Sequence, residues 1–386
     1  MRWILPFVLA SALSAATADT VGDMNRFAVE SYRELASGTG GNLVFSPFTT
    51  WSALSMLSPG ARGQTAAEIQ KVLGKTAADL SGICALAGEI TRSGNTGGNR
   101  LTTANSLWVQ QGFGLQADFT DALRDQFHLA PMQLDFVRDL DRSRLRINEW
   151  TQEHTGGKIL NLFGPGALHP DTRLVLASAL YFHGIWESRF RTGNSHPGDF
   201  HLATGAAKAT FMNQTAPFRY LETPAVQVLE MRYAGTSLAM DILLPKEGAS
   251  LDRSLSPAEL TEWFAGLQTR TVAVALPRFR SESAVSLRSM LTALGMATAF
   301  RESDADFSGI DGRRDLALSD VMHKCWIDVA EEGTEAAAAT GAVVNLISTV
   351  VSQPTVFRAD RPFVYILRDA HSGLILLMGR LANPLS

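Results

Sequence analysis

The sequence predicts an α+β fold in a single domain, and three observations support this prediction. Apolar residues repeat at helical spacing through roughly the first 160 residues, whereas apolar or alternating runs of strand length dominate from Leu174 onward. We find no tract rich in Pro, Ser and Gly that would separate two domains. With 386 residues, 46% of them hydrophobic, the chain can bury one large core. Helices early and strands late are typical of a large sheet partly covered by helices.

The first part of the chain reads mainly as helices that end at glycine or proline. Residues 21–35 have apolar positions at helical spacing, and a short strand at 42–47 ends at a proline, because the residue before proline avoids helical geometry. Further helices are predicted at residues 48–57, 65–73, 118–127 and 147–154, with a strand at 105–109 between them.

The second part reads as strands, because apolar and β-branched residues come in short runs that favour extended chain. The predicted strands are residues 174–182, 228–231, 238–244, 272–276, 321–329, 362–367 and 374–378. One helix, residues 285–294, interrupts them.

Composition and motifs exclude several classes of function. The net charge is −4 and Lys and Arg do not cluster, so nothing indicates binding to nucleic acid. The basic residues around Lys71 and Lys75 are too sparse for a polyanion stripe, so we do not expect heparin binding. The sequence has no Gly-x-Ser-x-Gly, His-Glu-x-x-His, Cys-x-x-Cys or phosphate-binding loop motif. We therefore predict that the protein is not an enzyme and holds no cofactor or metal.

Residues 1–18 read as a secretion signal. Arg2 supplies a positive start, the apolar stretch after it is too short to span a bilayer, and small residues precede Asp19. We expect cleavage there, a single mature domain of residues 19–386, and a secreted, extracellular protein that is periplasmic if the source is a Gram-negative bacterium. No later stretch approaches a transmembrane span, so no membrane partner is expected.

Cysteine and asparagine residues add two smaller expectations. Cys84 and Cys325 are too few for a disulfide scaffold, and they fall on a predicted helix and a predicted core strand. We expect two buried free thiols. Asn213 starts an Asn-Gln-Thr triplet that fits a glycosylation acceptor, and the sequence leaves its modification open.

The most informative segment couples an acidic start and one glycine to a run of very small residues. Its residues are Glu331, Glu332, Gly333, Thr334, Glu335, Ala336, Ala337, Ala338, Ala339 and Thr340. Alanine also favours helix, but residues 324–329 alternate like a strand and β-branched residues follow residue 342. On a strand, Thr334 would share an uncharged face with every second residue, and Glu335 would lie on the other face. Such a segment can be buried between two strands of a sheet without a clash.

This segment resembles the proximal hinge of the reactive centre loop in inhibitory serpins. Other blocks similar to the serpin family follow in the family's order along nearly all of the chain after residue 20. These blocks are residues 42–47, 57–61, 63–65, 104–109, 147–150, 155–159, 181–186, 306–310, 323–324, 360–363, 378–380 and 383–384. Any one block is weak evidence, but their order and spacing together are specific.

The resemblance implies the serpin fold, with three β-sheets, about eight or nine helices and an exposed reactive centre loop at about residues 331–357. It also implies an irreversible suicide inhibitor of serine proteases. In that family the protease forms an acyl-enzyme with the loop and is trapped when the freed hinge enters the main sheet, a known case of strand addition.

Family spacing places the scissile bond between Ile347 and Ser348, with Leu346 and Val350 as alternative cleavage points. An aliphatic residue fits the primary pocket of an elastase-, chymotrypsin- or subtilisin-like protease, rather than one built around a buried acid. The loop contains no Arg or Lys, so trypsin-like targets are not expected.

By position, the resemblance also implies a polar cluster that controls opening of the main sheet, made of Ser46, Thr49, Ser178 and His323. We call these four residues the shutter cluster. Ser178 stands where the family usually has Asn, and Thr49 replaces the more usual Ser. The missing amide either loosens sheet opening or is replaced by a water, and we expect His323 to bond Ser178 or Thr49.

The expected partner is a target serine protease, bound covalently by a protein that is otherwise a monomer. Two alternatives stay open. One is a protein of serpin fold that binds a ligand or acts as a chaperone without inhibition, which a bulky, charged or proline-bearing hinge would favour. The other is inhibition of papain-like cysteine proteases, which also form acyl-enzymes.

Overall fold

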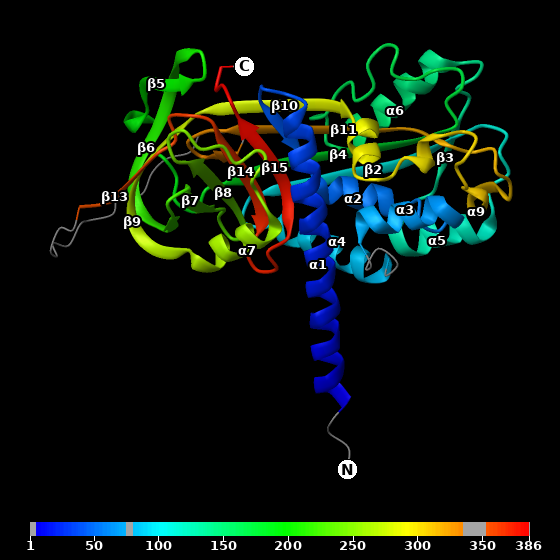
Figure 1. Cartoon of the computed structure of the whole chain (residues 1–386), viewed down its shortest axis with the longest axis horizontal. Helices are drawn as coiled ribbons and strands as arrows, with labels where there is room; N and C mark the ends of the chain where they lie inside the picture. The colour runs from blue at the N-terminus through cyan, green and yellow to red at the C-terminus, as the bar shows by residue number, and fades with distance from the viewer. Residues whose placement is uncertain (1–4, 75–79, 335–352, 386) are drawn as a thin grey trace.

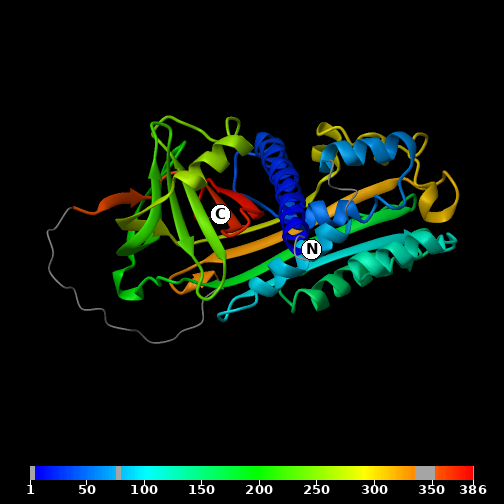
Figure 2. The same cartoon turned by 90° about the horizontal axis from the view of Figure 1, so that it is seen from below.

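The spine of the fold is a six-stranded sheet that runs along the length of the molecule (Figure 1). This computed structural model describes residues 5–74, 80–334 and 353–385. In spatial order the strands are β10 (Phe279–Ser286), β11 (Leu318–Val329), β12 (Gly333–Thr334), β4 (Leu174–Ile185), β2 (Arg100–Gln110) and β3 (Met132–Leu134). Figure 2 shows β11 (orange) and β4 (green) side by side, and they are paired in parallel as far as Trp326 and Tyr181. We call this pairing the β4–β11 seam.

The other strands form a nine-stranded network at one end of the molecule. In spatial order they are β1 (Leu43–Phe45), β15 (Ile375–Leu381), β14 (Phe363–Asp369), β8 (Leu238–Pro245), β7 (Val226–Arg232), β6 (Gly205–Glu222), β9 (Gln268–Pro277) and β13 (Thr355–Arg358), with β5 (His196–Leu202) paired to β6. The resemblance implied three separate sheets. The second and third are continuous here, because the 18-residue strand β6 pairs with β5, β9 and β7 along its length.

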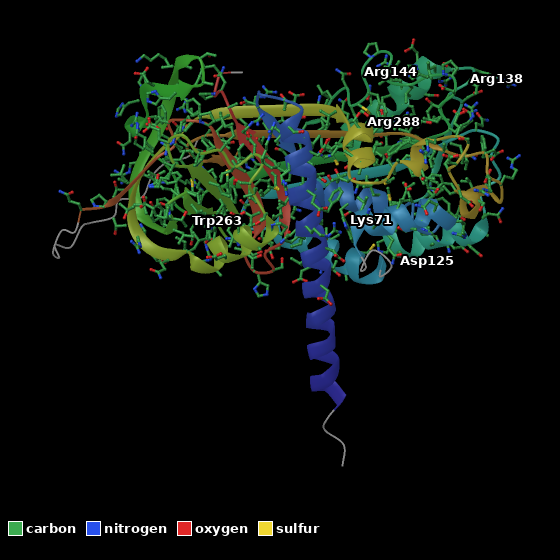
Figure 3. The ribbon with its side chains drawn as sticks, viewed as in Figure 1. Lys71, Asp125, Arg138, Arg144, Trp263 and Arg288 are labelled. Atoms are coloured by element: carbon green, nitrogen blue, oxygen red, sulfur yellow. The ribbon has the colours of Figure 1, made fainter. Side chains whose placement is uncertain are left out.

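Helices cover both sheets. Within the described residues they are α1 (Leu5–Ser37), α2 (Pro47–Ser55), α3 (Gly63–Leu73), α4 (Leu80–Ser93), α5 (Ala117–Phe127), α6 (Leu140–His154), α7 (Pro257–Gly266), α8 (Arg288–Ala293) and α9 (Ser308–Asp311). Figure 3 shows Trp263 of α7 beside the nine-stranded network, and Asp125 of α5 and Arg144 of α6 at the opposite end. The α+β serpin fold expected from the sequence is confirmed.

Helix α1 runs without a break through residues 5–18 of the segment predicted to be a secretion signal, and its first part projects away from the rest of the molecule (Figure 1). Along the described side chains, packing into the core begins near Val21, Met24 and Phe27, which are all buried. Within the described residues, no helix combines the length and the apolar character that a membrane crossing requires.

Apolar side chains fill the space on both faces of the six-stranded sheet. The larger cluster joins α1 to α5 with both sheets and includes Trp51, Phe182 and Tyr233. A second cluster, which includes Trp108 and Trp150, packs α6 and the segment after it against the opposite face. Each fully buried large apolar side chain contributes about 1.5 to 3 kcal/mol to the stability of the fold. Packing on both faces therefore stabilises the position of the sheet.

Three predictions about single segments need correction or comment. The predicted helix at 285–294 is wrong at its start, because Val285 and Ser286 end β10 in register with β11, and α8 begins only at Arg288. Both cysteines are free thiols; Cys325 is buried as expected, but Cys84 is only half-buried. Asn213 lies within β6, and its Nδ2 donates 2.9 Å hydrogen bonds to two backbone oxygens, one of which a glycan would displace.

Candidate functional site

The two-residue strand β12 enters the six-stranded sheet between β4 and β11. Thr334 pairs with Val329 of β11 and with Gly184 of β4, in both cases antiparallel. Gly333 has a φ of 155°, and a Cβ there would overlap the carbonyl oxygen of Gly184. Only glycine permits this approach. The glycine and threonine of the predicted hinge are therefore seated in the sheet as a strand.

Glu331, two residues before β12, anchors the start of the hinge. Its carboxylate accepts hydrogen bonds from Ser195 Oγ at 2.6 Å and from Nε and Nη2 of Arg278, the former at 2.7 Å. Burial of the Glu331 side chain opposes its charge, but these hydrogen bonds outweigh burial and lower the pKa of Glu331. Its carbonyl oxygen accepts from the backbone N–H of Phe190 at 2.9 Å.

Trp186 and Tyr233 hold the residues on either side of the glycine. The backbone N–H of Trp186 donates to the Glu332 oxygen at 2.8 Å, and its indole Nε1 donates to the Ala330 oxygen at 3.0 Å. The rings of Trp186 and Tyr233 are stacked with centroids 4.5 Å apart, and Tyr233 Oη lies 2.8 Å from Thr334 Oγ1. Thr334 is fully buried and faces the core between the two sheets.

The remaining predicted loop residues lie outside the described part of the chain. In the hinge they are Glu335, Ala336, Ala337, Ala338, Ala339 and Thr340, and around the expected scissile bond they are Leu346, Ile347, Ser348 and Val350. The chain is described again from residue 353, and Thr355–Arg358 form β13 at the edge of the nine-stranded network, parallel to β9.

The four predicted residues of the shutter cluster lie together beneath the β4–β11 seam. Ser46 caps α2, because its Oγ accepts from the Thr49 N–H at 3.1 Å. The Ser46 N–H donates to His323 Nε2 at 2.9 Å, and His323 Nδ1 lies 3.2 Å from Ser178 Oγ. Ser178 and His323 are also direct register partners across the seam. Of the two expected partners, His323 therefore bonds Ser178 and not Thr49.

The hydrogen bonds of His323 fix its protonation state. Since Nε2 accepts from a backbone N–H, it carries no proton, and Nδ1 of the neutral ring is the nitrogen that donates to Ser178. Complete burial lowers the pKa of His323 to about 3. A second proton would set two N–H donors against each other, so the cluster holds only while His323 is neutral.

A further polar residue, which was not predicted from the sequence, lies beside the shutter cluster. Asn105 of β2 lies opposite Ser178 of β4, and its Nδ2 donates to the Thr49 carbonyl oxygen at 3.1 Å. An amide thus reaches the cluster from the neighbouring strand, although Ser178 itself lacks one. The predicted strand 105–109 contained this residue, but its strand partner was not known from the sequence.

Comparisons with known proteins agree with this geometry. The family model described as serpin (serine protease inhibitor) matches residues 23–384. The chain is 37% identical to an uncharacterized serpin-like protein of Thermococcus kodakarensis over 94% of this chain and 85% of that protein. It is 36% identical to leukocyte elastase inhibitor of Bos taurus over 93% of this chain and 98% of that protein.

The structure superposes on a solved serpin with a TM-score of 0.86. That protein, the thermophilic serpin tengpin in its native state, is 25% identical, and the match covers 94% of each chain. The matched family is one of protease inhibitors and not of enzymes. From its fold, its seated hinge and these matches, we conclude that the chain belongs to the serpin family.

Proposed function

We propose that this protein is a suicide inhibitor that traps serine proteases by inserting its cleaved reactive centre loop into the six-stranded sheet. The protease serine attacks the carbonyl carbon at the scissile bond, and an ester to the enzyme forms as the C-terminal peptide leaves as an amine. The freed hinge then enters the sheet between β4 and β11 before water hydrolyses that ester, and it carries the protease away from its working geometry.

The observation that carries this proposal is the register of β12. Thr334 is paired with Val329 and with Gly184, and both pairings are antiparallel. If the same pairing continued for six residues, Thr340 would lie opposite His323 of β11 and Ser178 of β4. His323 and Ser178 are already partners across the β4–β11 seam. The two registers agree, so the seam needs only to part sideways to admit the hinge, and neither strand has to slide.

The side chains of the hinge suit this path. Thr334 faces the core, so Ala336, Ala338 and Thr340 would follow on the same face, where charge or bulk would be buried. Glu335 would lie on the opposite face, between the half-buried residues His183 and Asp328. No position of the inserted hinge would then bury an unpaired charge against the core.

Insertion would add more backbone hydrogen bonds than it breaks. Each β4–β11 pair that parts is replaced by two pairs, one on each side of the new strand. About ten additional ladder bonds, each with a net contribution of about 0.5 to 1.5 kcal/mol, give on the order of 10 kcal/mol. This is comparable with the stability of an ordinary domain, so the uncleaved state is metastable.

The proposed scissile bond is Ile347–Ser348, with Leu346 and Val350 as alternatives. The aliphatic residue favours proteases with apolar or small primary pockets, such as those of elastase-, chymotrypsin- and subtilisin-like enzymes. Leukocyte elastase inhibitors among the relatives support this choice of target class.

One gel experiment tests the proposed function. The protein is incubated with elastase, chymotrypsin, subtilisin and papain, and the products are separated in SDS. We expect an SDS-stable 1:1 complex with at least one serine protease. We also expect a released C-terminal peptide whose mass corresponds to a chain that begins at Ser348. A complex with papain alone would favour the alternative of cysteine protease inhibition. Cleavage by every protease without any complex would contradict the proposal and favour a non-inhibitory binding protein.

We also propose that residues 1–18 are removed during secretion. Supporting this, the described side chains of α1 pack into the core only from about Val21, and the family model begins at residue 23. N-terminal sequencing of protein secreted from its host should start at Asp19. An N-terminus at Met1 in purified cytosolic protein would contradict this.

A further inference from the structure

Four side chains line up across the β4–β11 seam, on the face of the six-stranded sheet that α6 partly covers. The rings of Tyr181 on β4 and Trp326 on β11 are stacked across the seam, with centroids 6.1 Å apart and planes at 27°. Lys158, from the segment after α6, lies with Nζ 5.5 Å from the Tyr181 centroid. Arg280 of β10 lies with Cζ 5.1 Å from the Trp326 centroid. Each ring thus contacts a cation in addition to the other ring.

The register of β12 places this stack at the first point where the seam must open. Tyr181 and Trp326 are the last of the paired residues before β4 and β11 diverge around β12. If the antiparallel pairing of Thr334 with Val329 and Gly184 continued for three residues, Ala337 would lie opposite Trp326 and Tyr181. The two hinge residues before Ala337 would enter a gap that is already open, whereas Ala337 would enter between the two rings.

Insertion therefore has to separate this aromatic pair. Neighbouring strands lie about 4.8 Å apart, so a strand between β4 and β11 roughly doubles the distance between the Tyr181 and Trp326 backbones. The contact between the rings is lost before any new ladder bond beyond residue 336 can form. The contact is lost before the new hydrogen bonds form, so it raises the activation barrier to insertion. Its effect on the stability of the inserted state is smaller.

We propose that the Tyr181–Trp326 stack, supported by Lys158 and Arg280, is a clasp that sets the rate at which the hinge enters the sheet. This inference rests on the proposed function, because it concerns the timing of the same insertion. The clasp delays insertion while the loop is intact and must yield within the lifetime of the acyl-enzyme. It is distinct from the shutter cluster, which lies three residues further along β11 and on the opposite face, where His323 meets α2.

A second contact on the same face lies two residues further along β11. Lys324 Nζ donates to the Leu160 carbonyl oxygen at 2.7 Å and pairs with Glu282 at 2.7 Å, which ties β11 to the segment after α6 and to β10. Because this contact does not bridge β4 and β11, parting of the seam does not break it directly. The clasp is thus the side-chain contact that lies in the path of Ala337.

The clasp is tested with a peptide, so that no protease reaction enters the measurement. A synthetic peptide of residues 335–347 is incubated with the intact protein, and its incorporation as an extra strand is followed on native gels. Trp326→Leu and Tyr181→Leu should each speed incorporation by about 2- to 10-fold, the range expected for one aromatic pair. The double variant should gain no more than either single variant, because both act on one contact. Trp326→Phe, which keeps a ring, should restore a rate near that of the unaltered protein.

A matched pair of variants separates the clasp from general loss of stability. Arg280→Gln removes a cation from the clasp, whereas Arg313→Gln removes a similar contact, with Cζ 5.4 Å from the centroid of the Phe113 ring, between two residues that lie on neither β4 nor β11. We expect a modest increase in rate only for Arg280→Gln. Unchanged rates for both leucine variants, or additive effects in the double variant, would overturn the clasp. Failure of the unaltered protein to incorporate the peptide at all would instead count against the proposed function.

Discussion

The backbone N–H of Ser46 donates a 2.9 Å hydrogen bond to Nε2 of His323, and both residues are fully buried. One end of the bond belongs to the cap of α2 and the other to the middle of β11. The bond therefore ties a helix beneath the sheet to the strand that would have to move in the proposed insertion of the hinge. Its acceptor exists only while His323 is neutral, which makes this tie sensitive to acid.

His323 should make the uncleaved protein less stable as the pH falls below neutrality. The pKa of His323 is about 3 in the folded protein and about 6.5 when unfolded, so between these values the unfolded chain binds more protons and stability rises with pH. Going from pH 7.5 to 5.5 should lower the free energy of unfolding by about 1.4 kcal/mol through this residue. His323→Gln, which cannot titrate, should lack this part of the slope in urea unfolding. Equal pH dependence of the unfolding free energy in both proteins would show that folding does not lower the pKa of His323.

Charge at the inward position of the hinge should abolish trapping. Thr334 is fully buried and bonded to Tyr233, so Thr334→Arg would have to bury an unpaired guanidinium at a cost of several kcal/mol. We expect this variant to be cleaved as a substrate with little or no SDS-stable complex. Glu335→Arg is the matched control, because residue 335 of an inserted hinge would face the other side of the sheet, so this variant should still form the complex. Stoichiometric complexes with Thr334→Arg would falsify the inward orientation.

Loss of the Glu331 charge should loosen the start of the hinge. Glu331→Gln keeps the shape of the side chain but weakens its hydrogen bonds from Arg278 and Ser195, which should reduce local stability by about 1 to 2 kcal/mol. The Phe190 amide, which donates to the Glu331 oxygen, reports on this anchor. Its hydrogen exchange should become about tenfold faster, whereas the surface variant Glu302→Gln should leave it unchanged. Equal protection in both variants would mean that the carboxylate contributes nothing to the anchor.

A basic residue at the expected scissile bond should change which protease the protein traps. In Ile347→Arg, the side chain would suit a primary pocket that carries a buried acid, so we expect an SDS-stable complex with trypsin and weaker reaction with elastase. The same change at Val350 is the control and should leave trypsin trapping weak. If Val350→Arg trapped trypsin and Ile347→Arg did not, the scissile bond would be assigned to Val350 instead of Ile347.

The elements that were predicted correctly from the sequence are those whose apolar residues follow a clear helix or strand pattern. The runs at 174–182 and 321–329 became β4 and β11, and helix 118–127 became α5, because continuous or regularly spaced apolar residues leave one choice. Strand β6 was missed, since polar residues such as Lys208 and Asn213 interrupt its apolar alternation. Helix α7 was also missed, although Ser256 caps it and Pro257 starts it.

The candidate site was predicted in part for a similar reason. A resemblance can assign Ser46, Ser178 and His323 to one cluster, since family order fixes their positions along the chain. Neither Asn105 nor Trp326 could be assigned in this way, because their roles depend on which residue of a neighbouring strand lies opposite. Strand register is a property of pairing across long sequence distances, and alternation alone does not determine it.

The central claim is that the hinge beyond Thr334 is more stable as a strand of the six-stranded sheet than outside it. The most direct measurement compares the melting temperature of the intact protein with that of the protein cleaved once within residues 341–352. Cleavage should raise the melting temperature by tens of degrees, since on the order of 10 kcal/mol is gained on insertion. Thr334→Arg should not show this rise. Equal melting temperatures for intact and cleaved protein would contradict the account.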